Sequence, residues 1–162
     1  MLLAVLRRLT RKGRPMIMCH VEAGTGKMKD TTSIGDLTEF EVLTALMRTR
    51  KRLLRPVSAG LRYDLAIDNG DGTVVRVQCK TGLLRNGFIS FRVCNADARR
   101  PRGVPYSGQI EAFGVYCPQN GRAYLIPIEA IGTNVSTARL RVEPTRNGQH
   151  RGIRLAESFE IG

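Results

Sequence analysis

The stretch that decides the fold is Val74-Val75-Arg76-Val77-Gln78-Cys79-Lys80. Apolar and polar residues alternate along it, which is typical of a strand with one buried face. Val77 and Cys79 lie on the apolar face, and Gln78 and Lys80 lie on the polar one. We expect the apolar face to pack under a helix or a second layer, which leaves Gln78 and Lys80 side by side with a polar purpose.

The preceding segment, residues 62–68, reads as a second strand and carries Asp64 in an apolar context. Between the two strands, Asn69-Gly70-Asp71-Gly72 is a strong reversal signal, so we expect an antiparallel hairpin. Asp64 and Gln78 share a face only if the numbers of paired residues add to an even value. This excludes a loop of those four residues alone. We therefore predict an odd-length loop or a bulge near Gly72.

A helix is expected before the hairpin. The run Thr31-Thr32-Ser33 can supply its N-cap, Asp36 falls in its first turn, and it runs through about Arg50. Its apolar residues at helical spacing are Leu37, Phe40, Leu43, Leu46 and Met47. At about 100° per residue, Glu39 falls on the inward arc of this helix. A buried carboxylate is costly, so Glu39 requires either an ion pair with Arg or Lys or a metal ion.

The remainder of the chain is predicted to be mostly strands. They are expected around residues 54–57, 88–93, 110–117 and 122–128, with a turn at Pro118-Gln119-Asn120-Gly121. Residues 95–108 are rich in Gly, Pro and Arg and are expected to form a loop. Either this loop contacts phosphate through Arg99, Arg100 and Arg102, or it is simply solvated.

Composition limits the classes of partner. The 162 residues, 42% of them hydrophobic, suit one α/β domain with a real core. The net charge of +12 favours nucleic acid as partner, and the absence of Trp disfavours an RNA-binding protein. Four widely spaced cysteines lack the spacing of a zinc site. With no secretory signal and no membrane-spanning run, we expect no membrane partner, a cytoplasmic location and reduced thiols.

The polar groups around the hairpin match the needs of phosphodiester hydrolysis. That reaction uses a divalent ion held by oxygen ligands, and a group that orients or deprotonates the attacking water. Asp64 supplies a carboxylate, and the Gln78 side-chain carbonyl and the Cys79 backbone carbonyl are further oxygen ligands. Lys80 can hold the nucleophile or bind transition-state oxygens. Glu39, arriving from the helix, completes the set.

At these residues the chain resembles a known family. The motifs Gly35-Asp36-x-x-Glu39, Arg62-Tyr63-Asp64-Leu65 and Val77-Gln78-Cys79-Lys80 look like the PD-(D/E)XK nuclease superfamily. They are similar, more narrowly, to its group I intron-encoded homing endonucleases, which place Gln where most members carry Asp or Glu. The resemblance continues through residues 110–116, 124–127 and 139–141, and so extends from about Met28 to the C-terminus.

This resemblance implies a restriction-endonuclease-like α/β core, with a central mixed sheet flanked by helices. It assigns catalytic roles to Glu39, Asp64, Gln78 and Lys80. The metal ligands become Asp64, Gln78, Cys79 and Glu39, with Mg²⁺ as the cofactor and Mn²⁺ as a substitute. Double-stranded DNA becomes the substrate. Because cutting both strands requires two active centres, we expect a homo-oligomer, either a dimer or a tetramer.

The sequence also suggests segment boundaries and alternative functions. Residues 1–27 are expected to be a basic, disordered arm, 28–130 the nuclease core, and 131–162 a basic extension packed on that core. In the extension, Arg139 and Arg141 either follow a DNA backbone or solvate the segment. A Holliday-junction resolvase or an Mrr-like restriction nuclease would use the same core. A non-catalytic basic DNA-binding protein on this scaffold is the other alternative.

Overall fold

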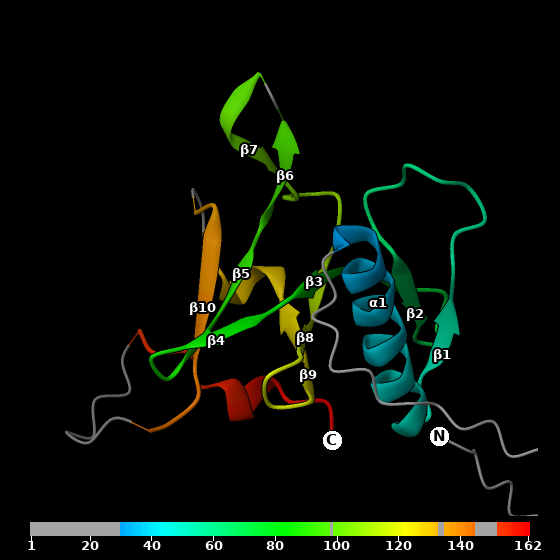
Figure 1. Cartoon of the computed structure of the whole chain (residues 1–162). Helices are drawn as coiled ribbons and strands as arrows, with labels where there is room; N and C mark the ends of the chain where they lie inside the picture. The colour runs from blue at the N-terminus through cyan, green and yellow to red at the C-terminus, as the bar shows by residue number, and fades with distance from the viewer. Residues whose placement is uncertain (1–29, 98, 133–134, 145–151) are drawn as a thin grey trace, which may run out of the picture.

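A central sheet of five strands organises the molecule (Figure 1). The computed structural model describes residues 30–97, 99–132, 135–144 and 152–162, except for the side chains of 96, 97 and 100–102. In spatial order the strands are β1 (Arg52–Leu54), β2 (Leu65–Asp68), β3 (Val74–Thr81), β8 (Ala112–Cys117) and β9 (Arg122–Pro127). Strands β3 and β8 run parallel, and the other neighbours are antiparallel. The predicted mixed sheet of an α/β fold is confirmed.

The hairpin of β2 and β3 has the predicted register. Asp68 pairs with Val74, so the connection is residues 69–73, an odd-length loop. The backbone N–H of Asn69 donates to the carbonyl of Thr73 at 3.1 Å and closes this loop. Leu65 pairs with Val77, and the same register carried one residue further sets Asp64 opposite Gln78.

Helix α1 (Thr31–Arg48) covers one face of the sheet (Figure 1). Its buried side chains are Thr38, Val42 and Leu46, one from each successive turn. Val42 and Leu46 pack in a cluster with Val77 and Cys79, the apolar face of β3. That face therefore lies under the helix, as predicted.

The ends and the phase of α1 differ from the sequence prediction. The N-cap is Asp30, whose carboxylate accepts from the N–H of Thr32 at 3.0 Å and from the Ser33 hydroxyl at 2.9 Å. The helix ends at Arg48, and Asp36 lies beyond its first turn. Three residues expected on the buried face, Leu37, Phe40 and Met47, are 40%, 55% and 60% exposed.

A polar residue explains the error in phase. Thr38 is only 2% exposed, because its hydroxyl forms a hydrogen bond of 2.7 Å with the hydroxyl of Thr81 on β3. A buried hydroxyl with a partner is tolerated in a core. The inward face is thus centred on Thr38 rather than on the more apolar Leu37.

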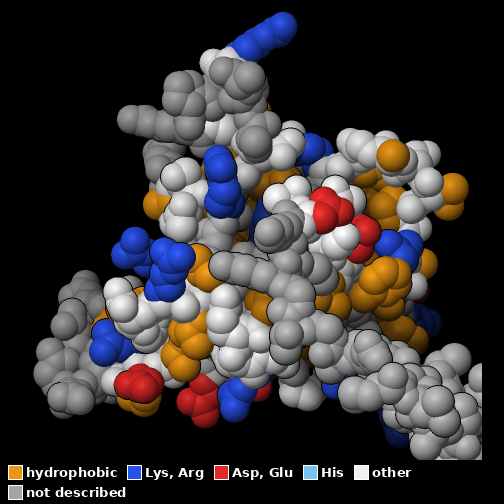
Figure 2. Space-filling view, viewed as in Figure 1, with side chains coloured by type: hydrophobic (Ala, Val, Ile, Leu, Met, Phe, Trp, Pro, Cys, Tyr) orange, Lys and Arg blue, Asp and Glu red, His pale blue; other side chains and the backbone are white. Residues whose placement is uncertain are grey.

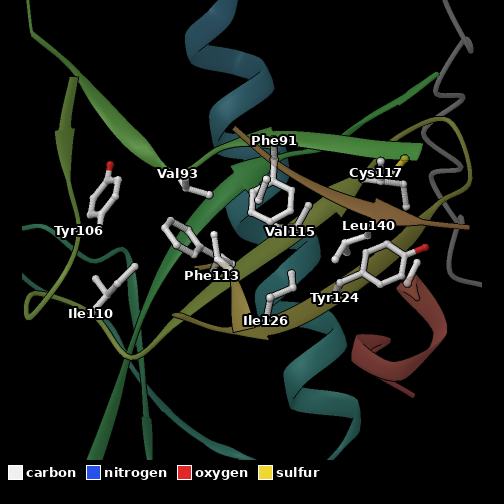
Figure 3. Packing of buried hydrophobic residues seen from close by; sticks show 14 residues of the cluster. Phe91, Val93, Tyr106, Ile110, Phe113, Val115, Cys117, Tyr124, Ile126 and Leu140 are labelled. Carbon is white, nitrogen blue, oxygen red and sulfur yellow. The ribbon is translucent and has the colours of Figure 1, made fainter. Parts of the chain in front are cut away.

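The opposite face of the sheet carries a second, smaller sheet in place of a helix. Its order is β10 (Thr137–Arg141), β5 (Phe88–Arg92) and β4 (Leu83–Arg85), and all its pairs are antiparallel. Ile89, Phe91 and Leu140 of this sheet pack against Phe113 and Tyr124 of the central one (Figure 3). Strand β5 was predicted from the sequence, whereas β4 and β10 were not.

Residues 95–108 are not the loop that was expected. Most of them belong to a two-stranded hairpin of β6 (Cys94–Asp97) and β7 (Arg100–Pro105), which stands out from the body of the molecule (Figure 1). Gly103 makes the pairing possible, since a Cβ at that position would lie 2.3 Å from the carbonyl oxygen of Asn95. The Gly and Pro content, interpreted as a loop signal, accommodates a narrow hairpin instead.

The strand boundaries elsewhere shift by a few residues from those predicted, and β1 begins two residues earlier. The turn between β8 and β9 falls at residues 118–121, as predicted. Two short 3₁₀ helices, η1 (Ile128–Ala130) and η2 (Ala156–Phe159), complete the described fold. Within the described ranges, no helix has the length and apolar character needed to cross a bilayer.

Candidate active site

Asp64 and Gln78 meet across the β2–β3 hairpin. The backbone N–H of Asp64 donates to the carbonyl of Val77 at 2.9 Å, which continues the strand pairing up to the site. The Asp64 carboxylate accepts a short hydrogen bond from the Gln78 side-chain amide and another, of 2.7 Å, from the N–H of Cys79. The expected convergence of these side chains is therefore present.

The Gln78 amide lies between two acceptor oxygens. Its Nε2 donates to the Asp64 carboxylate and, at 3.5 Å, to the backbone carbonyl of Cys79. Gln78 is 9% exposed, so this amide is almost withdrawn from water. A carboxylate and a carbonyl aimed at one point form a position that favours a positively charged group.

The Cys79 thiol takes no part in this cluster of polar atoms. Burial, aided by the negative charges of Asp64 and Glu39, raises the pKa of the Cys79 thiol well above its ordinary range. The thiol therefore stays protonated and belongs to the apolar cluster under α1. Cys79 meets the site through its backbone, with the N–H that donates to Asp64 and the carbonyl that accepts from Gln78.

Lys80 lies on the same face of β3 as Gln78. Its Nζ is 3.0 Å from the hydroxyl oxygen of Tyr106 and 5.1 Å from the centre of the Tyr106 ring. Tyr106 follows β7 and is 3% exposed. The lysine ammonium is thus held at the edge of the site by a buried aromatic residue.

Glu39 reaches the site from α1. It is half-buried, and Arg55, which follows β1, forms an ion pair with it at 3.3 Å. Glu39, Arg55 and Asp64 line one small cavity of about 150 Å³. Of the two compensations that the sequence allowed for Glu39, the structure contains the arginine ion pair, and the cavity leaves room beside the carboxylate.

The two carboxylates of the site influence each other. Burial is the main cause that raises the pKa of Asp64, and the N–H of Cys79 and the charge of Lys80 oppose it. Burial likewise raises the pKa of Glu39, the charge of Asp64 raises it further, and Arg55 opposes the shift. Both carboxylates therefore lie where a nearby cation would stabilise their charged forms.

The donor set fits a hard divalent cation. Two carboxylates, one side-chain amide and one backbone carbonyl are the oxygen groups that Mg²⁺ and Mn²⁺ prefer. In the part of the chain that the structure describes, no three His, Cys, Asp or Glu side chains gather into a metal cluster. A metal ion here would thus depend on the amide of Gln78 and the carbonyl of Cys79 as well as on the carboxylates.

Four arginines share the outward face of the second sheet. The register aligns Arg139 and Arg141 of β10 with the outward residues of β5 and β4, which include Arg92 and Arg85. Basic side chains gather over these strands on the left of Figure 2. Within the described residues, none of the four forms an ion pair with Asp or Glu.

The other predicted DNA-binding arginines belong to the β6–β7 hairpin. Arg99 lies in its turn and is exposed. The side chains of Arg100 and Arg102 lie outside the described residues, although their backbone forms part of β7. Figure 1 places this hairpin and the second sheet on the same side of α1.

Sequence reasoning missed several neighbours of the site. Tyr106 lay in the segment interpreted as an arginine-rich loop, and its being the one aromatic residue there was the available signal. Arg55 and Arg62 reach their partners only through the tertiary fold. Glu111 is another, since its carboxylate accepts from both the backbone and the guanidinium of Arg76 and joins the first residues of β3 to the start of β8.

Comparisons with known proteins bear on the family and the fold of the chain. The model of the PD-(D/E)XK endonuclease family matches residues 29–162. The fold is similar to that of I-Ssp6803I, a bacterial homing endonuclease, with a TM-score of 0.60 over 83% of this chain and 88% of that one. The two sequences are 18% identical, so the likeness is one of fold. No curated protein matches the chain.

Proposed function

Because the chain belongs to the PD-(D/E)XK endonuclease family, we propose that it is a Mg²⁺-dependent homing-type endonuclease that hydrolyses DNA. The observation that carries the proposal is the meeting of Asp64 and Gln78 across the β2–β3 hairpin, with Lys80 on the same face. The catalytic residues are then Glu39, Asp64, Gln78 and Lys80.

The proposed metal ligands are the carboxylates of Asp64 and Glu39, the Gln78 side chain and the Cys79 carbonyl. Gln78 presents its nitrogen to Asp64, and a half-turn of the amide presents its oxygen instead. A bound Mg²⁺ or Mn²⁺ would neutralise charge on the phosphate and lower the pKa of bound water. Arg55 balances Glu39 in the absence of the ion.

Besides the metal ion, Lys80 is the proposed source of positive charge at the active site. Its ammonium can donate to the attacking water or to a phosphate oxygen as negative charge builds there. Asp64 lies within reach of this charge, since Lys80 opposes the rise in the pKa of Asp64 that burial causes. Lys80 and Asp64 thus bring opposite charges to one site, with the lysine ammonium at its edge beside Tyr106.

Double-stranded DNA is the proposed substrate. The outward arginines of the second sheet, Arg85, Arg92, Arg139 and Arg141, form no ion pair with Asp or Glu in the described residues and can therefore bind a polyanion. The β6–β7 hairpin adds Arg99, Arg100 and Arg102 by sequence. A duplex seated against both elements would contact phosphates on either side of one groove.

A homo-oligomer, dimer or tetramer, is the proposed form for cutting both strands, since one site cuts one strand. Sedimentation of the protein with and without DNA measures the state directly. A monomer in both conditions would contradict this part of the proposal.

The test of the proposed function is cleavage of linear, supercoiled and branched DNA with Mg²⁺ or Mn²⁺. We expect Asp64→Asn and Lys80→Ala to lower the rate by roughly a hundredfold or more while DNA binding is retained. The matched controls are Asp68→Asn, the same change at the far end of β2, where Asp68 forms an ion pair with Arg52, and Lys51→Ala, an exposed lysine. Both controls should cut normally.

Other outcomes select among the alternatives. Strong preference for branched over linear DNA would favour a Holliday-junction resolvase. No cutting of any substrate, together with salt-sensitive binding that ignores metal, would favour the non-catalytic DNA-binding protein. That protein would retain the Gln78 amide and the Arg55–Glu39 ion pair as purely structural contacts.

A further inference from the structure

Two positively charged side chains, Lys80 and Arg62, contact Tyr106. The Lys80 Nζ lies 3.0 Å from its hydroxyl oxygen, and the Arg62 guanidinium carbon lies 4.1 Å from the centre of its ring. The ring also packs edge-on against Phe113, with centroids 5.6 Å apart and planes at 89°. In Figure 3 the hydroxyl points away from Phe113 and Ile110 and out of the apolar cluster.

Arg62 is itself fixed to the end of the β6–β7 hairpin. Its Nη2 donates to the carbonyl oxygens of Val104 and Pro105, at 3.3 and 3.1 Å. Its Nε donates to the side chain of Gln109. With its donors committed in this way, the guanidinium forms a rigid plate over the Tyr106 ring.

Such a fixed ring is suited to holding a lysine. A lysine side chain has four carbons and several rotamers, so an unrestrained ammonium explores a wide volume. The Tyr106 hydroxyl accepts one ammonium hydrogen, and the other two remain for water or phosphate. Because the hydroxyl is on a buried ring, the acceptor has little freedom of its own.

We propose that Tyr106 is a positioning residue for Lys80, and that Arg62 fixes the Tyr106 ring and ties it to the β6–β7 hairpin. The proposal rests on the proposed nuclease function of Lys80. In this role Tyr106 acts through Lys80 and not directly on substrate or metal. A purely structural Tyr106 would have its hydroxyl satisfied by Lys80 and would matter only for stability.

The first test is the single-turnover rate of Tyr106→Phe at saturating protein. This change removes the hydroxyl and keeps the ring, so DNA affinity should stay within about twofold, and the rate should fall roughly tenfold to a hundredfold. The matched control is Tyr124→Phe. Tyr124 is 1% exposed, its hydroxyl accepts from Asn120 at 2.9 Å, and it lies at the other end of the cluster (Figure 3).

Equal rates for Tyr106→Phe and Tyr124→Phe, both near that of the wild type, would overturn the proposal. The comparison is made at matched free energy of unfolding, measured in urea, so that a loss of stability is not mistaken for a loss of positioning. A wild-type protein that cuts no DNA would refute the proposed function instead.

The second test does not depend on activity. In protein with isotope-labelled lysine, the NMR signal of the Lys80 ammonium is assigned by its loss in Lys80→Arg. We expect Tyr106→Phe to shift this signal and to speed its hydrogen exchange, and Arg62→Lys to do so to a smaller extent. An unchanged signal in Tyr106→Phe would refute the positioning role even where the nuclease is active.

Discussion

At the scale of single residues, Gln78 is the position where this site departs from a simple pair of carboxylates. Its amide donates to Asp64, whereas a carboxylate there would repel it. The neutral side chain therefore stabilises the metal-free site, and it weakens the attraction for a cation. A substitution at Gln78 should therefore change metal affinity and the stability of the metal-free protein in opposite directions.

We expect Gln78→Glu to tighten Mg²⁺ binding and to destabilise the metal-free protein. The change removes a buried hydrogen bond and places a new charge beside Asp64, which costs about 1–3 kcal/mol. Calorimetric titration with Mg²⁺ and urea unfolding in EDTA measure the two effects. If stability without metal rose, Gln78 would not be the donor that the structure shows.

Glu111 is one of the residues that link stability to pH. Hydrogen bonds from Arg76 hold the pKa of the Glu111 carboxyl below its ordinary value. Its stabilising effect is therefore complete above the pKa of the unfolded chain and is lost as the pH falls through the lower, folded value. The pair is partly exposed, so the effect is small.

We expect Glu111→Gln to lower the free energy of unfolding at neutral pH by about 1 kcal/mol or less. In acid below the ordinary carboxyl range, the difference from the wild type should vanish, because Glu111 is then protonated in both states. Urea unfolding of Glu111→Gln and the wild type at neutral pH and in acid measures this difference. A difference that grew in acid would contradict the sign of the Glu111 pKa shift.

At the scale of elements, the contact between α1 and β8 depends on the absence of a side chain. A Cβ on Gly114 would lie 2.6 Å from a methyl carbon of Val42 and 3.1 Å from one of Val77. Two methyl groups of the core thus occupy the position of a side chain at Gly114. The helix can lie this close only because β8 has a glycine at that point.

We expect Gly114→Ala to destabilise the fold by about 1–3 kcal/mol through overpacking. Gly35→Ala is the matched control, because Gly35 lies in α1 with nothing within 4 Å of a new Cβ. That control should be neutral or stabilising by up to about 1 kcal/mol, since alanine favours a helix. Thermal unfolding measures the change in stability of both variants. Similar values would mean that α1 does not lie as close to β8 as described.

The same scale shows which elements the sequence could predict. The β2–β3 hairpin followed from alternation and parity, because a one-residue slip would move Asp64 to the other face. Strand β10 was missed although Ala138 and Leu140 alternate inward, because Arg139 and Arg141 were interpreted as a basic tail. The alternation of a strand was present in the sequence, but the prediction relied on the arginines and not on the alternation.

What could not be predicted for the site has a different cause. The order and faces of Asp64, Gln78 and Lys80 are local properties of one hairpin, so sequence alone could place them. The Tyr106 and Arg62 contacts join distant parts of the chain, from before β2 to after β7. No local pattern encodes such contacts, since they depend on how the β6–β7 hairpin folds back onto the central sheet.

At the scale of the whole molecule, the charge of the chain is distributed unevenly. The net charge is +12, and the second sheet presents four arginines on one face. The acidic residues of the site lie instead between α1 and the hairpin. A polyanion drawn to the basic face would be repelled where it approached the carboxylates, and a metal ion bound between them would offset that repulsion.

The basic face makes a prediction about salt. Each arginine that contacts a phosphate releases counterions on binding, so its loss lowers the slope of log affinity against log salt by about one. We expect Arg92→Gln with Arg139→Gln to reduce both affinity and slope, about equally for different sequences. Arg48→Gln, at the exposed end of α1 on the opposite side of the central sheet, is the control. Fluorescence anisotropy over a salt series measures the slopes. If the single control lost half as much slope as the double variant, or more, the charge would attract DNA without orienting it, and the duplex would not lie on this face.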